Sequence, residues 1–317
     1  MTEVDRSRYV LSEAENERIF RERIVPQQLA GTPQEQPIAV IVSGQTGAGK
    51  TAIAALVTTA LAVRGESVTL NLDTCKPHHP MFDELMAADD TTAGAYTSID
   101  GHKWLEKSEA YALEQGFDLV MESAMRDPRD FEEPAARLRA AGYRIEIPVV
   151  AVHASESRLG ALDRYLRQVE AFGQGRKIDL AIHDACYDGV LRATGHLDTG
   201  PLAHAVFVVR RDASVVHRTH LDSSDRRLDA PDTPGAVERE RNAPWPERRS
   251  RVFADATGRA LRRIEALPPE MRAPARQELA EVVELARPLA HPDAYAAMRS
   301  MLATPQGRPS GRSRSQR

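Results

Sequence analysis

The chain has 317 residues, of which 42% are hydrophobic and 28% charged, so it is long enough to bury a core and is neither collagen-like nor wholly disordered. Its 42 basic and 46 acidic residues leave a net charge of −4, which attracts neither nucleic acid nor an anionic membrane surface. Two cysteines exclude a disulfide framework, no apolar run reaches the roughly 18 residues of a membrane span, and the polar N-terminus is unlike a signal peptide. We therefore expect a cytoplasmic protein.

The predicted elements begin with a helix that Ser12 and Glu15 cap and that ends near Pro26. Strands and helices then alternate, which predicts a mostly parallel sheet with helices on both faces and ligands at the carboxyl ends of the strands. We expect strands at 38–42, 68–72, 117–121, 145–152, 204–209 and 214–217, and helices at 50–63, 99–115, 132–141, 155–172 and 180–193.

The composition changes after residue 221. Residues 223–251 are dense in charge and proline and predict a linker or loosely packed surface, whereas 252–267 and 270–289 have helical patterns. The last residues contain four arginines and no acid, which is typical of a disordered tail. We therefore expect a core at 1–221, a charged linker and helical extension at 222–304, and a disordered tail at 305–317.

One segment predicts the chemistry. Gly44-Gln45-Thr46-Gly47-Ala48-Gly49-Lys50-Thr51 matches G-x-x-x-x-G-K-[ST], the phosphate-binding loop (P-loop), and lies between an apolar strand and a helix as that loop requires. Backbone N–H groups of such a loop converge on phosphates, Lys50 reaches the β- and γ-phosphates, and the Thr51 hydroxyl ligates Mg²⁺. The alternative is a glycine-rich turn that ends in Lys-Thr by chance. The pattern favours ATP or GTP with Mg²⁺ as cofactor.

Two carboxylates follow predicted strands at the same edge of the sheet. Asp73 comes directly after the strand 68–72 and is placed to accept a proton from a hydroxyl, although it could instead cap a turn. Glu122 comes after the strand 117–121 and could hold Mg²⁺-bound water or substrate, or lie at the surface without a role.

Two arginines could stabilise a transferring phosphoryl group. Arg164 lies in a predicted helix, and Arg176 follows a glycine-containing turn. A forked guanidinium suits phosphate oxygens, but arginines on helices are more often solvated or paired with acids. His183 and Asp184 we interpret as structural.

Taken in order, these segments resemble the zeta toxin family of P-loop kinases. The resemblance runs from about Glu15 to about His217. It includes the helix before the P-loop, the Asp-Thr-x-Lys-x-x-His-Pro run at Asp73 to Pro80, the segment RIEIPVVAVHASESRLGALDRY, Glu122 with Arg126, and Arg176 ahead of His183-Asp184.

This resemblance implies phosphorylation of the 3′-hydroxyl of UDP-N-acetylglucosamine by a toxin that a small helical antitoxin holds inactive. By position it implies that Asp73 is the general base, Lys50 the phosphate-binding lysine, and Arg164 and Arg176 the residues that stabilise the transferring phosphate. It also implies substrate-side roles for Glu122, Arg126 and Lys76.

Two positions depart from the family pattern. Thr46 stands where proline is usual, and Ala124 stands where the family has a threonine that contacts substrate. A lost substrate hydrogen bond can change selectivity, so a kinase for another hydroxyl, such as an antibiotic or a nucleotide metabolite, stays open. So does a nucleotide-dependent interaction protein. We do not expect nucleic-acid binding, because the arginine-rich tail would supply affinity without specificity.

Overall fold

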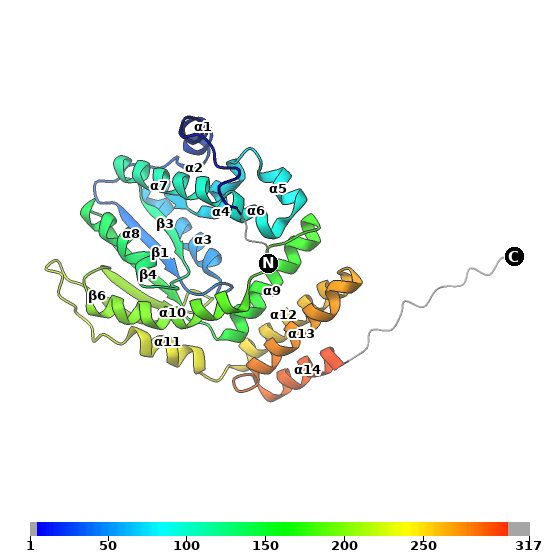
Figure 1. Cartoon of the computed structure of the whole chain (residues 1–317). Coiled ribbons are helices and arrows are strands. Elements are labelled where there is room, and N and C mark those ends of the chain that lie inside the picture. The colour runs from blue at the N-terminus through cyan, green and yellow to red at the C-terminus, as the bar shows by residue number, and fades with distance from the viewer. Residues whose placement is uncertain (1–4, 304–317) are drawn as a thin grey trace. The chain divides into compact units, whose positions relative to one another are not determined.

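A computed structural model describes residues 5–303 and contains one six-stranded sheet (Figure 1). The strand order is β2-β3-β1-β4-β5-β6, and all neighbours are parallel except β5 and β6. The strands are β1 (Ile38–Ser43), β2 (Val68–Leu70), β3 (Leu119–Ser123), β4 (Arg144–Val150), β5 (Ala205–Val209) and β6 (Val215–His220). The expected α/β fold is confirmed.

Helices connect the strands, and side-chain caps or glycines mark several of their ends. Ser12 caps α1, His153 caps α9, Asp179 caps α10, and Gly116 ends α7 in the left-handed conformation. The helices are α1 (Glu13–Ile19), α2 (Val25–Gln28), α3 (Lys50–Leu61), α4 (Leu72–Cys75), α5 (Phe82–Ala88), α6 (Asp90–Tyr96), α7 (Ser98–Gln115), α8 (Arg129–Ala140), α9 (Ala154–Phe172), α10 (Leu180–Thr199) and α11 (Thr233–Asn242), with short π or 3₁₀ segments at η1 (Phe20–Ile24), η2 (Ala62–Arg64) and η3 (Lys76–His78).

The sheet has helices on both faces because successive side chains of a strand point to opposite sides. Ala39 and Ile41 of β1 pack in a core with residues of α7, α8 and α10, whereas Val40 and Val42 pack with residues of α3. Figure 1 shows α3 on the far side of the sheet from α8 and α10. Helix α3, which follows the P-loop, therefore covers one face of the sheet, and α7, α8 and α10 cover the other.

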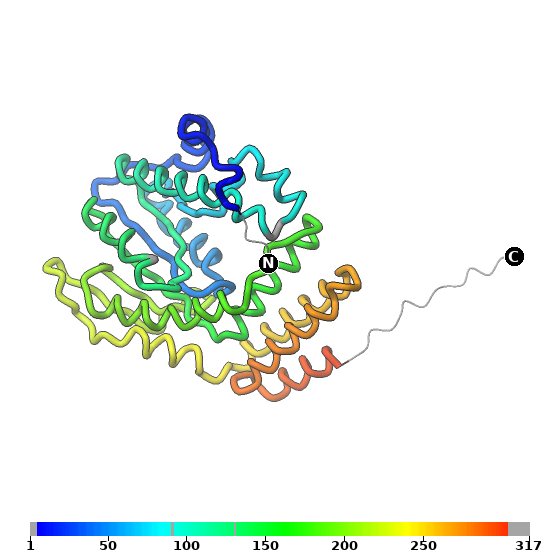
Figure 2. The backbone as a smooth tube through the Cα atoms, in the orientation of Figure 1, coloured from blue at the N-terminus to red at the C-terminus, as the bar shows by residue number. Residues whose placement is uncertain are grey.

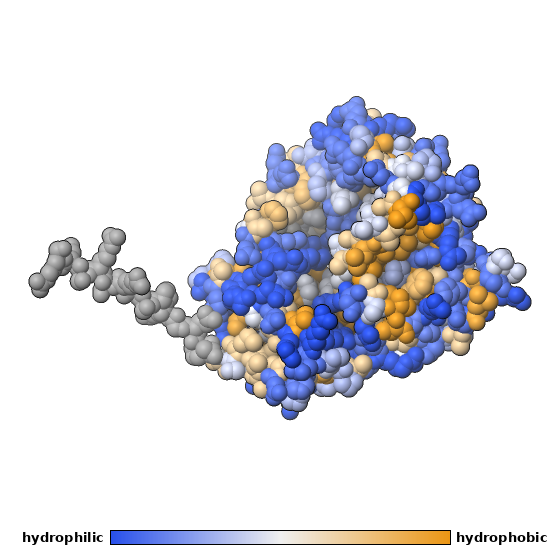
Figure 3. Space-filling model, turned by 180° about the vertical axis from the view of Figure 1, so that it is seen from behind, coloured by the Kyte–Doolittle hydropathy of each residue, from blue (hydrophilic) through white to orange (hydrophobic). Residues whose placement is uncertain are grey.

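One large apolar side chain of α3 and another just after it are exposed. Leu56 is 53% exposed, and Val63, just beyond the helix, is 89% exposed. Figure 3 views the molecule from the side of α3 and shows orange apolar residues grouped among blue polar ones. No helix within residues 5–303 is both long and apolar enough to cross a bilayer.

Two boundaries at the edge of the sheet differ from those expected. Strand β2 ends at Leu70, because the Asn71 side chain accepts a hydrogen bond from the Asp73 amide at 2.8 Å and starts α4. Asp73 therefore lies in the first turn of a short helix. Strand β3 continues to Ser123, because Glu122 pairs with Val42 of β1, so Glu122 lies inside a strand. The N-terminal helix also runs through Pro26, the second residue of α2, which directly follows the π-helical segment Phe20–Ile24.

The chain divides into two compact units after Asn242, later than the boundary expected at 221. Part of the segment expected as a linker is α11, which belongs to the first unit. Its Ala236 and Val237 are buried in the same core as Ile41, and burial of this apolar side is what orders the charged helix. Figure 2 shows α11 (yellow) running beside α10 (green).

In the second unit, residues 243–303 form three helices, α12 (Glu247–Ala266), α13 (Pro269–Ala286) and α14 (Pro292–Ala303). Its core includes Phe253, Leu261, Leu279, Val283 and Met298. The helices expected at 252–267 and 270–289 are confirmed, and α14 was not expected. The tail at 305–317 lies outside the described residues.

Candidate functional site

A cavity of about 1150 Å³ opens where β1, β2 and β3 end. Its walls come from the P-loop, the segment after β2, the end of β3, helix α9 and the segment before α10. Lys50, Asp73, Arg164 and Arg176 all line it, together with Thr46, Gly47, Gly49, Thr51, Glu122 and Ala124. The structure thus brings together the four residues expected to be catalytic, at the edge of the sheet where ligands were expected.

The P-loop depends on glycine at its tightest point. Gly47 has φ of +78°, and a Cβ atom there would lie 1.9 Å from the backbone oxygen of Ser157 on α9. Gly49 has φ of +102° and directly precedes the first residue of α3. The loop therefore turns sharply against α9, and the N-terminus of α3, where the first residues line the cavity, favours an anion there.

Lys50 is held at the start of α3 by its own loop. Its ammonium donates hydrogen bonds to the carbonyl oxygens of Gly44 at 2.8 Å and Gln45 at 3.2 Å. Burial of the ammonium lowers the pKa of Lys50 to about 8, an effect that the charge of Glu122 opposes. Phosphate oxygens beside this ammonium would favour its charged form and so raise the pKa of Lys50.

Thr51 and Glu122 supply oxygen atoms at the mouth of the loop. The Thr51 hydroxyl donates to the Glu122 carboxylate at 3.4 Å. Within residues 5–303 no cluster of three or more His, Cys, Asp or Glu side chains could hold a metal by itself. Mg²⁺ in nucleotide sites is bound through one or two protein oxygens together with phosphates and water, so a hydroxyl and a carboxylate fit this ion.

Asp73 projects into the cavity between two cations. Its Oδ1 accepts hydrogen bonds from Arg176 Nη1 at 3.2 Å and from Lys76 Nζ at 3.5 Å, and its side chain remains 58% exposed. Lys76 is itself buried, and burial lowers its pKa. Asp73 is therefore an accessible carboxylate held in place by two cations, both of which the sequence had singled out.

Arg164 faces the same cavity from α9. Burial lowers its pKa, and the charge of Arg176 acts in the same direction, while Asp73 and Glu122 oppose it. Its buried Nε has no hydrogen-bond partner among the residues that the structure describes. A buried donor without a partner is costly, and a phosphate oxygen in the cavity would satisfy it.

Two residues that were predicted to bind substrate do not line the cavity. Arg126 is exposed and is not among the residues that line the cavity. Lys76 contacts Asp73 but does not form part of the cavity wall. Their substrate-binding roles therefore stay predictions.

Arg211, which follows β5, was missed by sequence reasoning. Its guanidinium donates to the carbonyl oxygens of Gly47 at 2.6 Å, Glu156 at 2.9 Å and Ala48 at 3.0 Å, and it lines the cavity. It ties the P-loop to α9. Its position at the carboxyl end of a strand is the one signal in the sequence. That signal is weak, because an arginine after a strand is common.

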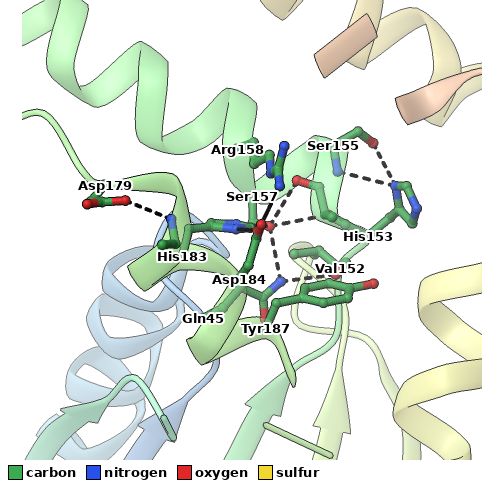
Figure 4. Close-up of polar contacts among 12 residues, drawn as sticks. Gln45, Val152, His153, Ser155, Ser157, Arg158, Asp179, His183, Asp184 and Tyr187 are labelled. Carbon is green, nitrogen blue, oxygen red and sulfur yellow. Dashed lines mark hydrogen bonds and ion pairs between the residues drawn. The ribbon is translucent and has the colours of Figure 1, made fainter. Parts of the chain in front are cut away.

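His183 is structural, as expected. It is 1% exposed, its Nδ1 bonds to Asp184 at 2.8 Å, and its Nε2 lies 2.9 Å from Ser157 Oγ (Figure 4). Burial lowers the pKa of His183. Because a carboxylate only accepts, Nδ1 carries the proton and Nε2 accepts from the serine hydroxyl. Ser157 is fully buried, so this Ser-His-Asp arrangement cannot act as a nucleophile.

The family model described as "Zeta toxin" matches residues 22–222. Toxin zeta of Streptococcus pyogenes is 30% identical over 131 residues, which are 41% of this chain and 45% of that protein. Toxin PezT of Streptococcus pneumoniae serotype 4 is 25% identical over 199 residues, 62% of this chain and 76% of that protein. The chain thus spans about half the length of the first of these relatives.

A solved structure has the same fold. It comes from the PezAT chromosomal toxin–antitoxin system of Streptococcus pneumoniae and aligns with a TM-score of 0.68 at 19% identity. The alignment covers 81% of this chain and 98% of the solved one.

Proposed function

This chain belongs to the zeta toxin family, and we propose that it is a kinase that transfers the γ-phosphate of ATP or GTP to a sugar hydroxyl, with the 3′-hydroxyl of UDP-N-acetylglucosamine as the principal acceptor. The observation that carries the proposal is the meeting of Lys50, Asp73, Arg164 and Arg176 in one cavity beside the P-loop. An accessible carboxylate, a phosphate-binding lysine and two arginines are the groups that transfer to a hydroxyl needs.

Each residue has a role that its position supports. The P-loop N–H groups and Lys50 bind the β- and γ-phosphates, and Thr51 with Glu122 would hold Mg²⁺, which when bound neutralises phosphate charge. The hydroxyl oxygen of the acceptor forms a bond to the γ-phosphorus while the bond from that phosphorus to the leaving nucleoside diphosphate breaks. Asp73 accepts the proton that the hydroxyl loses. Arg164 and Arg176 stabilise the negative charge on the transferring group.

Ala124 favours a second acceptor class. It lines the cavity, and its methyl group cannot make the hydrogen bond that the family threonine makes. A different hydroxyl compound, such as an antibiotic or a nucleotide metabolite, is therefore the alternative substrate.

Toxicity in the cytoplasm and control by a small helical antitoxin form part of the same proposal. The names of the matched relatives and the toxin–antitoxin system of the matched structure support it. Leu56 of α3, the helix that follows the P-loop, is exposed and is one place where such a partner could bury apolar area.

Incubation with labelled ATP and Mg²⁺ and a panel of nucleotide sugars, aminoglycosides and simple alcohols tests the proposal. We expect a phosphorylated nucleotide sugar, and an Asp73→Asn variant that binds ATP normally but transfers about 10²–10⁴-fold more slowly. Asparagine keeps the size of the side chain but cannot accept a proton at neutral pH, so unchanged transfer would mean that Asp73 is not the general base. ATP binding without transfer to any acceptor would instead favour a nucleotide-dependent interaction protein.

A further inference from the structure

The second residue of the P-loop is anchored through its side chain. Gln45 is fully buried, and its carboxamide nitrogen donates to the Val152 carbonyl at 3.1 Å and to Ser157 Oγ at 3.2 Å (Figure 4). Its carboxamide oxygen accepts a hydrogen bond from Arg241 at 3.0 Å. The backbone carbonyl of Gln45 also accepts from Lys50. Any displacement of this side chain would therefore move the atoms that hold the phosphate-binding lysine.

Arg241 reaches the loop from α11, which lies beyond residues 22–222 that match the family model. It is 1% exposed, its Nη1 donates to the Tyr187 carbonyl at 2.9 Å, and its guanidinium carbon lies 3.8 Å from the centre of the Tyr187 ring. These contacts hold the guanidinium flat against α10 while its other nitrogen bonds to Gln45.

The charge of Arg241 is buried without a direct counter-charge. Among residues 5–303 no carboxylate forms an ion pair with it, and burial lowers its pKa to about 10. The carboxylates that act on it, Asp188 and Glu238, do so only through their field. The guanidinium of Arg241 contacts two carbonyl-type oxygens and one aromatic ring. Because burying an unpaired charge is unfavourable, these contacts matter for holding it in place. One of those two oxygens belongs to the P-loop.

We propose that Arg241 is a positioning residue for the nucleotide site: it fixes the Gln45 side chain and so keeps the P-loop in its phosphate-binding conformation before nucleotide arrives. The inference rests on the proposed binding of a nucleoside triphosphate, but not on the identity of the acceptor. It gives α11 a role in the site, although Arg241 itself does not line the cavity.

The test uses the full chain and two measurements. Arg241→Met keeps most of the volume and removes the guanidinium. Arg239→Met is the matched control, because Arg239 lies on the same helix, is mostly exposed and forms an ion pair with Asp232. We expect Arg241→Met to weaken the binding of ATP with Mg²⁺, measured by calorimetry, about tenfold or more, since a buried hydrogen bond is lost. Hydrogen exchange of the amides at 44–49, measured without nucleotide, should accelerate. The control should match the wild type in both.

A double variant separates positioning from general stability. If Arg241 acts through Gln45, then Gln45→Met with Arg241→Met should bind ATP no more weakly than the worse single variant. A folded Arg241→Met protein with wild-type ATP affinity and wild-type exchange at 44–49 would overturn the inference, as would additive losses in the double variant. If Arg241→Met does not fold, Arg241→Lys decides by the same criteria, because lysine keeps the charge but cannot bond to Gln45 and Tyr187 together. Normal ATP binding without phosphotransfer would refute the kinase proposal and leave this one standing.

Discussion

The pKa of Lys50 leads to a prediction about nucleotide binding and pH. Burial lowers this pKa from its ordinary value of 10.5 to about 8, so the ammonium of the free protein loses its proton at moderately alkaline pH. Phosphate oxygens favour the charged lysine, so the complex with ATP keeps the proton to higher pH. Above pH 8, binding must therefore take up a proton, and affinity must fall as pH rises.

The size of both pH effects follows from the pKa of Lys50 in the free protein, about 8, and from its ordinary value of 10.5. A free-protein pKa of about 8 predicts that affinity for ATP with Mg²⁺ falls about tenfold between pH 7 and pH 9. The free energy of unfolding should change in the opposite direction. The unfolded chain binds the proton up to about pH 10.5, so between pH 8 and 10.5 the folded protein gains stability from Lys50 as pH rises, by about 3 kcal/mol in total.

Calorimetric titration with ATP at pH 7, 8 and 9, in buffers of different ionisation enthalpy, measures both affinity and proton uptake. Lys50→Arg is the control, because a guanidinium stays charged across this range and should remove the uptake. Lys50→Met should remove the stability change in denaturant unfolding. A wild-type affinity that is flat from pH 7 to 9, with no proton uptake, would refute the reasoning, because Lys50 would then keep its ordinary pKa.

Three further changes test the loop, the metal site and the core. Gly47→Ala should abolish ATP binding, because the added Cβ would overlap a backbone oxygen on α9. Gly142→Ala is the control, since Gly142 also has a positive φ but faces open space; it should lower the free energy of unfolding by only about 1 kcal/mol and leave ATP binding unchanged. Thr51→Val should raise the Mg²⁺ concentration needed for transfer and leave the melting temperature nearly unchanged. Asp118→Ala should lower the free energy of unfolding by about 2–3 kcal/mol, because the buried carboxylate bonds to Arg64 at 2.7 Å; an unchanged denaturation midpoint would contradict this.

The parts of the site that depend on local sequence could be predicted. The P-loop needs only its own glycines, the strand before it and the helix after it, so eight consecutive residues were enough to predict a phosphate site. The placement of Asp73 and Glu122 at one edge of the sheet was also predicted, because parallel strands share that edge. The predicted local structure around these two residues was wrong in detail. The Asn71 cap starts a helical turn where a strand was expected to continue, and pairing with β1 extends β3 past Glu122.

Only the tertiary structure decided what holds the loop in place. Arg211 and Arg241 contact P-loop atoms across 163 and 196 residues of chain, and each bonds to a carbonyl or amide oxygen. Every residue offers such oxygens, so no pattern in the sequence marks which one an arginine will reach. The segment that forms α11 was expected to be part of a linker, because its charged composition predicts exposure. Only the packing of Ala236 and Val237 into the core buries Arg241 behind the loop.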